Sequence, residues 1–159
     1  MLAAITHQEA YGHAIEGDER LTHRKLDDAA QWASKDTAGD ARGGHGSFCT
    51  VPYLELQRAN CWATLGHQKR AIAHFEAVLP NLPAIYRRDR GVAYGRLARA
   101  YASNGQVEIA AHRGRRALAI ARSSGSTRIE RTVAQLGRQL ARHRRLASVA
   151  ELLDDLGTA

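Results

Sequence analysis

The chain has 159 residues, of which 44% are hydrophobic, and a formal net charge of +7. Alanine and leucine occur 29 and 16 times, whereas valine and isoleucine together occur 13 times and proline 3 times. Because alanine and leucine favour helices while β-branched residues favour strands, this composition excludes an all-β domain and predicts an all-α fold. No apolar run approaches the roughly 18 residues of a membrane span, and the first residues do not follow a signal-peptide pattern. A cytoplasmic location is therefore expected.

The positive charge is concentrated in the second half of the chain. Residues 1–79 carry 8 basic and 10 acidic residues, whereas residues 80–159 carry 15 arginines and 6 acidic residues. Such asymmetry indicates an acidic partner for the second half. Arginine-rich drift in a GC-rich genome, with the arginines on solvated helix faces, is the alternative.

The first part of the chain predicts two helices and a loop. Hydrophobic spacing favours helices over residues 9–16 and 18–32, with Gly17 as the break and Asp18 as the N-cap of the second helix. Residues 35–50 are rich in glycine and lack an apolar period, which predicts a flexible loop. The expected organisation is an N-terminal hairpin, a degenerate repeat, over residues 1–34, the loop over 35–50, and helical repeats with a C-terminal helix over 51–159.

The segment after the loop repeats with a period of 39 residues. At this shift Trp62 coincides with Tyr101 and Leu140, and Gly66 coincides with Gly105. A helix–turn–helix pattern of this period predicts stacked hairpins, each of which buries its apolar face on the next. With the N-terminal pair included, about eight helices are expected, the last over residues 146–156.

These repeats resemble the tetratricopeptide repeat (TPR), whose pattern is W-x2-L-G-x2-Y, then A-x3-F, then Pro. The first copy places Ala59, Trp62, Ala71, Phe75 and Pro83 at the corresponding positions. The second and third copies keep the small residues, although Gly114 replaces the aromatic residue and Arg144 replaces the turn glycine. The resemblance implies a superhelix of antiparallel helical hairpins.

Residues 7–156 are also similar to the C-terminal region of Xre-type helix-turn-helix transcriptional regulators from Streptomyces and related actinobacteria. The segment WATLGHQKRAIAHFEAVL, residues 62–79, carries much of this similarity. It implies a sensor or assembly region that binds a protein or peptide partner, or dimerises. A helix-turn-helix domain needs about 60 further residues upstream, so DNA contact is expected only through an attached domain absent from this chain. The alternative is a stand-alone basic adaptor that contacts nucleic acid directly.

In TPR arrays, exposed positions of the first helix of each repeat line a groove that binds partners. Leu56 takes one of these positions. The residues expected to bind the partner are Tyr53, Gln57, Asn60, Arg96, Arg99, Arg131, Gln135, Arg138 and Arg142. Amide side chains can form hydrogen bonds with an extended peptide backbone, and guanidinium groups can form bidentate hydrogen bonds with a carboxylate. An acidic protein or peptide segment is therefore the expected ligand, and the chain's own last helix or a second subunit is the alternative occupant.

The sequence contains no pattern typical of an enzyme, a cofactor site or a metal site. Its 8 histidines are scattered without an HExxH motif, and the glycine-rich segment lacks the Gly-Lys-Ser/Thr ending of a phosphate loop. Cys61 is predicted to lie in the core, and Cys49 to be an exposed thiol in the loop. A cluster of outer arginines is expected on a solvated face: Arg113, Arg115 and Arg116.

Overall fold

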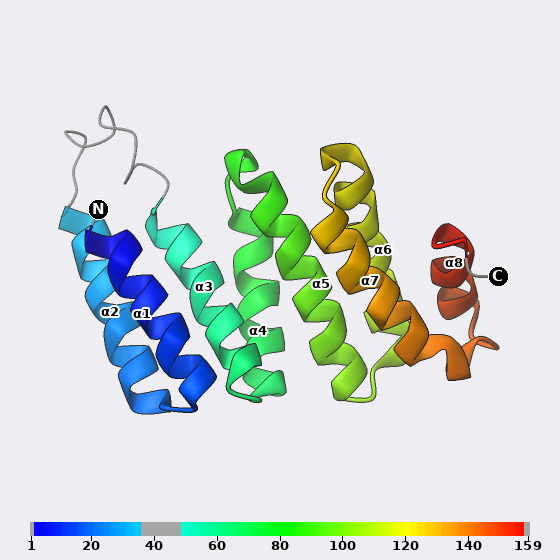
Figure 1. The fold of residues 1–159 in the computed structure, drawn as a ribbon, viewed down its shortest axis with the longest axis horizontal. Coiled ribbons are helices and arrows are strands. Elements are labelled where there is room, and N and C mark those ends of the chain that lie inside the picture. The colour runs from blue at the N-terminus through cyan, green and yellow to red at the C-terminus, as the bar shows by residue number, and fades with distance from the viewer. Residues whose placement is uncertain (1, 36–48, 158–159) are drawn as a thin grey trace. The chain divides into compact units, whose positions relative to one another are not determined.

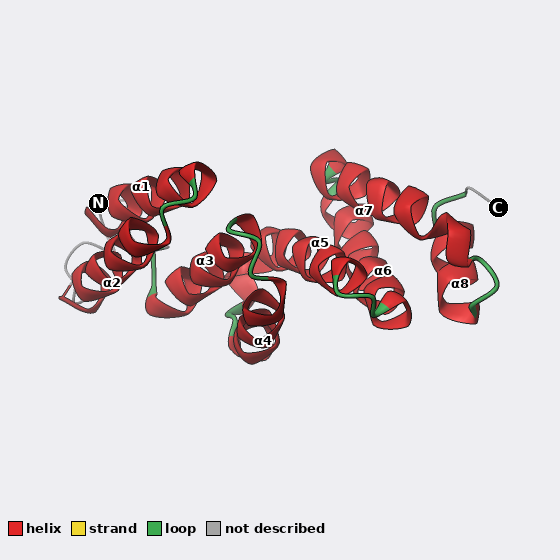
Figure 2. Cartoon of the chain, turned by 90° about the horizontal axis from the view of Figure 1, so that it is seen from below, coloured by secondary structure: helices red, strands yellow, loops and turns green. Residues whose placement is uncertain are grey.

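The computed structural model describes residues 2–35 and 49–157, and the fold within these residues is all-α (Figures 1 and 2). The expected fold class is thus confirmed. The α-helices are α1 (Leu2–Glu16), α2 (Glu19–Lys35), α3 (Val51–Thr64), α4 (Gln68–Val78), α5 (Arg87–Ser103), α6 (Val107–Ser124), α7 (Thr127–Leu140) and α8 (Ala147–Asp155). Short 3-10 turns complete the fold: η2 (Leu79–Asn81), η3 (Ala84–Tyr86) and η4 (Ala141–His143).

The chain forms two compact units, residues 1–82 and residues 83–159. The boundary between them falls within the expected repeat segment 51–159, and the N-terminal hairpin shares its unit with α3 and α4. The predicted loop over residues 35–50 lies mostly outside the described residues. No helix in the described part of the chain is both long and apolar enough to cross a membrane.

The first helix is longer than predicted. It begins at Leu2 instead of residue 9, because Ala3, His7, Ala10 and Ala14 form one continuous buried face. Spacings of three and four residues place these side chains along a single helical stripe. The predicted cap of the next helix is confirmed, since Asp18 Oδ1 accepts a hydrogen bond from the Leu21 amide at 2.8 Å.

A glycine stands at the same place in each of three helical hairpins. Gly17, Gly66 and Gly105 lie between α1 and α2, α3 and α4, and α5 and α6, with φ values of +83°, +85° and +78°. A Cβ atom makes this left-handed backbone costly, so glycine is the residue that ends the first helix sharply. Gly66 and Gly105, which coincide at the 39-residue shift, therefore occupy the same kind of turn as Gly17.

Trp62 joins three helices of the first unit. From α3, its ring centroid lies 4.0 Å from that of His23 on α2 and 4.7 Å from the guanidinium carbon of Arg70 on α4. Glu19 reinforces the contact, because its carboxylate lies 3.2 Å from Arg70 Nη1 and 2.9 Å from His67 Nε2. The Trp62 side chain therefore packs between α2, α3 and α4.

In the second unit, two glycines permit close helix packing. A Cβ at Gly114 of α6 would lie 2.7 Å from Leu136 Cδ2, because the leucine side chains of Leu136 and Leu152 occupy the space beside it. A Cβ at Gly91 of α5 would lie 2.7 Å from Ile129 Cδ1 and 2.8 Å from Ile120 Cγ2. These distances are far below ordinary van der Waals contact.

The last helix, α8, closes the second unit by packing against α6 and α7. Its residues Val149, Leu152 and Leu153 are buried, which places them in the core of this unit. Arg115 of α6 forms ion pairs with Glu151 and with Asp155, the latter at 2.6 Å. Arg115 is therefore only partly solvated, because α8 supplies two carboxylates next to it.

We predict opposite effects for alanine at two helical glycines. Gly91→Ala should lower the free energy of unfolding by about 1 kcal/mol, because the new methyl group overpacks Ile120 and Ile129 by more than the gain in helix propensity offsets. Gly12→Ala is the control, since a Cβ there meets no atom within 4 Å. It should raise the free energy of unfolding by about 0.5 kcal/mol. Urea unfolding followed by circular dichroism measures both, and stabilisation by Gly91→Ala would contradict the packing.

Candidate functional site

The predicted groove residues of the first unit are largely engaged in packing. Tyr53 is half-buried, and its ring centroid lies 5.7 Å from that of His7 in an edge-on contact. Asn60 is only 5% exposed, and its Nδ2 donates a hydrogen bond to Gln57 Oε1 at 3.0 Å. Leu56 is 1% exposed. The expected exposure of Leu56 and Asn60 is therefore wrong, which leaves Gln57 and Tyr53 as the partly accessible members.

Four of the predicted groove residues of the second unit lie on one face of α7 and the turn that follows it: Arg131, Gln135, Arg138 and Arg142. We call Arg128, Arg131, Gln135, Arg138 and Arg142 the arginine stripe; all five are exposed, and the last lies in η4. Alternating spacings of three and four residues place them on a single side of the helix. The opposite side carries the buried residues Ile129, Val133, Leu136 and Leu140. The stripe therefore projects away from the core that fixes the helix.

Arg128 was not among the residues predicted from the sequence. The TPR alignment takes the first exposed position of this repeat as Arg131, so it stops one turn short. The spacing of three residues from Arg128 to Arg131 is the signal that would have found it, because it continues the periodicity of the stripe backwards.

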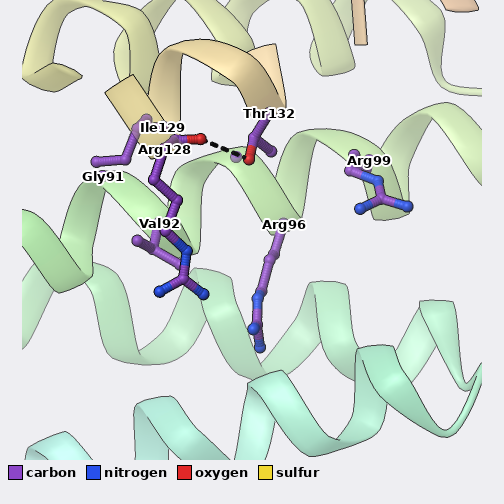
Figure 3. A pocket seen from close by; sticks show the side chains of 8 residues that line it. Gly91, Val92, Arg96, Arg99, Arg128, Ile129 and Thr132 are labelled. Atoms are coloured by element: carbon purple, nitrogen blue, oxygen red, sulfur yellow. Dashed lines mark hydrogen bonds between the residues drawn. The ribbon is translucent and has the colours of Figure 1, made fainter. Parts of the chain in front are cut away.

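Arg96 and Arg99 come from α5 and flank one end of the arginine stripe. A hollow of about 150 Å³ lies between α5 and α7 and is lined by Gly91, Val92, Gly95, Arg96, Arg99, Arg128, Ile129 and Thr132. Figure 3 shows the Arg128 side chain reaching past Val92, with the Arg96 side chain extending on the same side of α5. The hollow is thus bordered by guanidinium groups from two helices.

The close approach of α5 and α7 accounts for this arrangement. A Cβ at Gly95 would lie only 3.2 Å from Thr132 Cγ2, so a larger residue would press the two helices apart. Thr132 is itself fixed, since its hydroxyl donates to the Arg128 carbonyl at 3.1 Å. The contact between Thr132 and Gly95 lies one helical turn after Arg128. It therefore fixes the backbone from which the Arg128 side chain extends.

The charge of this face is not neutralised within the described residues. No ion pair joins Arg99, Arg128, Arg131 or Arg138 to a carboxylate there. Unit 2 has 15 arginines against 6 acidic residues, and Glu151 and Asp155 of α8 are already paired with Arg115. The positive electrostatic field of these arginines attracts carboxylates and phosphates from solution.

The other outer arginines of α6 contact the protein itself. The guanidinium carbon of Arg116 lies 4.9 Å from the centroid of the Tyr94 ring, a cation–π contact between α6 and α5. Arg115 and Arg116 therefore make contacts within the second unit, and Arg116 is at the same time exposed, as the sequence predicts.

Cys49 is not the exposed thiol that the sequence predicts. It is 6% exposed, and its Sγ lies 4.0 Å from Nδ1 of the buried His7. Burial raises the pKa of the Cys49 thiol and lowers the pKa of the His7 imidazole, so both groups are held in their neutral forms. A neutral thiol is a weak nucleophile. Cys61 is buried, as predicted.

The described residues contain no group of three or more histidine, cysteine, aspartate or glutamate side chains placed to hold a metal ion. Comparison with known protein families, with curated proteins and with solved structures finds no match to this chain. The TPR and Xre-type similarities therefore rest on the residues of the sequence alone.

We predict that acid destabilises the first unit through His7. A group whose pKa is lower in the folded state than in the unfolded state contributes stability above the unfolded value, about 6.5, and loses it as the pH falls below that value. The urea midpoint should therefore decrease between pH 7 and pH 5, and less so in His7→Leu. His23, whose pKa burial also lowers, acts in the same direction, so part of the decrease remains.

The exposed His112 provides the matched control for this experiment. His112→Leu should keep the full decrease of the wild-type chain. Equal pH dependence in His7→Leu and in the wild type would show that His7 is not buried in its neutral form.

Proposed function

We propose that this protein is a protein–protein interaction module whose second unit binds an acidic segment of a partner protein. The observation that carries the proposal is the arginine stripe of α7, where exposed guanidinium groups recur along a single helix face and form no ion pair with a carboxylate of the described residues. Arg96 and Arg99 widen the same basic face at the α5 side.

The spacing of the arginine stripe indicates how carboxylates would be arranged on a matching partner segment. From Arg128 to Arg142 the stripe spans 14 residue steps, or about 21 Å at the rise of an α-helix. A partner segment with carboxylates at spacings of three and four residues would present them along one face of its own helix. Each guanidinium group could then meet a carboxylate in the bidentate geometry that favours arginine over lysine.

From the resemblance of its sequence to Xre-type regulators, we infer that such a module acts in transcriptional regulation. On this proposal the chain is the sensor or assembly region, and it contacts DNA only through an attached helix-turn-helix domain. Partner binding would then control that domain. The expected cytoplasmic location agrees with this role.

Direct binding of nucleic acid is the competing function, because phosphates would also be attracted to the stripe. Proteins that bind single strands combine basic residues with exposed aromatic rings for base stacking. Tyr86, Tyr94 and Tyr101 of the second unit are all buried. This burial favours carboxylates over nucleic acid as the ligand.

The test measures binding of a labelled helical peptide with glutamates spaced to match the stripe. Reversal of three charges, Arg128→Glu, Arg131→Glu and Arg138→Glu, should weaken binding by on the order of fiftyfold, since each exposed pair contributes up to about 1 kcal/mol. The affinity of the unmodified chain should fall between 50 and 300 mM salt because the charges are exposed.

Three exposed bases of the first unit provide a control with the same change in net charge: Arg20→Glu, Arg24→Glu and Lys69→Glu. This control should bind the peptide nearly as well as the unmodified chain. Equal losses in both triple variants would reduce the effect to net charge and contradict a site on α7. Tighter binding of a DNA duplex than of the acidic peptide would favour the nucleic-acid function.

A further inference from the structure

A second hollow, of about 140 Å³, lies between α7 and α8. Most of its lining is apolar: Ala134, Gly137, Ala141, Leu153 and Leu156. The small residues come from α7 and the 3-10 turn that follows it, Leu153 comes from α8, and Leu156 directly follows α8. A Cβ at Gly137 would lie 2.6 Å from Leu156 Cδ1, so the two elements approach closely at this point. An apolar group of a ligand that entered the space beside that contact would be partly removed from water, which is favourable.

Two arginines, Arg138 and Arg144, complete the lining of this hollow. Within the described residues neither side chain forms an ion pair or a hydrogen bond. Two of the three acidic residues of α8, Glu151 and Asp155, pair with Arg115 of α6. The third, Asp154, forms no ion pair within the described residues. Two guanidinium groups are thus placed beside an apolar space with no counter-charge from the fold.

We propose that this hollow binds a small carboxylic acid with an apolar body of about the size of a phenyl ring. Its volume is close to that of an engineered apolar cavity of about 150 Å³ that binds benzene. The apolar body would lie against Leu153 and Leu156, and the carboxylate would accept hydrogen bonds from Arg138 and Arg144. This site uses residues outside the arginine stripe except for Arg138.

A polypeptide that ends in leucine would offer the same combination of apolar group and carboxylate. The lining favours the free acid, because it contains no amide or hydroxyl side chain to bond the backbone of an extended peptide. The apolar lining also distinguishes this site from a general anion site, at which the body of the ligand would make no difference.

Titration calorimetry with 3-phenylpropanoate tests the proposal. We expect saturable binding with one site per chain, and at least tenfold weaker binding of acetate, which lacks the apolar body, and of 3-phenylpropan-1-ol, which lacks the charge. Arg144→Gln should weaken binding about tenfold, because it removes a charge-assisted hydrogen bond. The neighbouring Arg145→Gln is the matched control and should bind as the unmodified chain does, since Arg145 does not line the hollow.

Ala134→Leu fills the hollow without changing its charge and should abolish binding. Ala141→Leu serves the same purpose if the first variant does not fold, as judged by circular dichroism. Binding that survives the filling variant, or that is equal for phenylpropanoate and acetate, would overturn the proposal. It would also be overturned if a peptide with a free C-terminal leucine bound while phenylpropanoate did not. The reversal of Arg128 and Arg131 should leave phenylpropanoate binding in place, so this site and the proposed partner site can fail separately.

Discussion

Close approach of helices is the constraint on which the rest of this structure depends. Alanine and glycine supply it, because helices whose facing side chains are small can pack at short distance and still exclude water. Ala93, Ala98, Ala110 and Ala117 are all fully buried in the second unit. Larger side chains such as Leu97 and Leu140 fill the remaining space, and contacts such as Leu136 against Gly114 fix how the helices fit together.

This packing also determines which charges are available for binding. The core of the second unit holds the apolar face of α7 and leaves the opposite face to solvent. The α8 carboxylates that face α6 are paired with Arg115, whereas the α7 side of α8 presents leucines. The ion pairs of α8 therefore serve one arginine of α6, and none of them reaches an arginine of α7.

Local features of the fold could be predicted from the sequence, and features that depend on distant contacts could not. Gly17, Gly66 and the Asp18 cap depend on a few adjacent residues, and their turns were predicted correctly. The burial of Cys49 depends on His7, which is 42 residues away in the chain. The Asn60 and Leu56 positions were inferred by resemblance, and their burial depends on tertiary packing. Arg128 does not follow from the TPR alignment, whose first exposed position in this repeat is Arg131. The three-residue spacing between Arg128 and Arg131 would have identified it.

The arginine stripe carries only positive charge, and this limits which surface a twofold dimer of the chain can use. In a twofold dimer the same patch of each subunit faces its own copy, so an interface must be complementary to itself. A patch that displays arginines and a glutamine would set cation against cation, and the energy of that repulsion would fall only with added salt or bridging anions. If the chain forms a dimer, the twofold axis must therefore pass through another surface. The stripe would then remain available, once on each subunit, to a chain of different sequence.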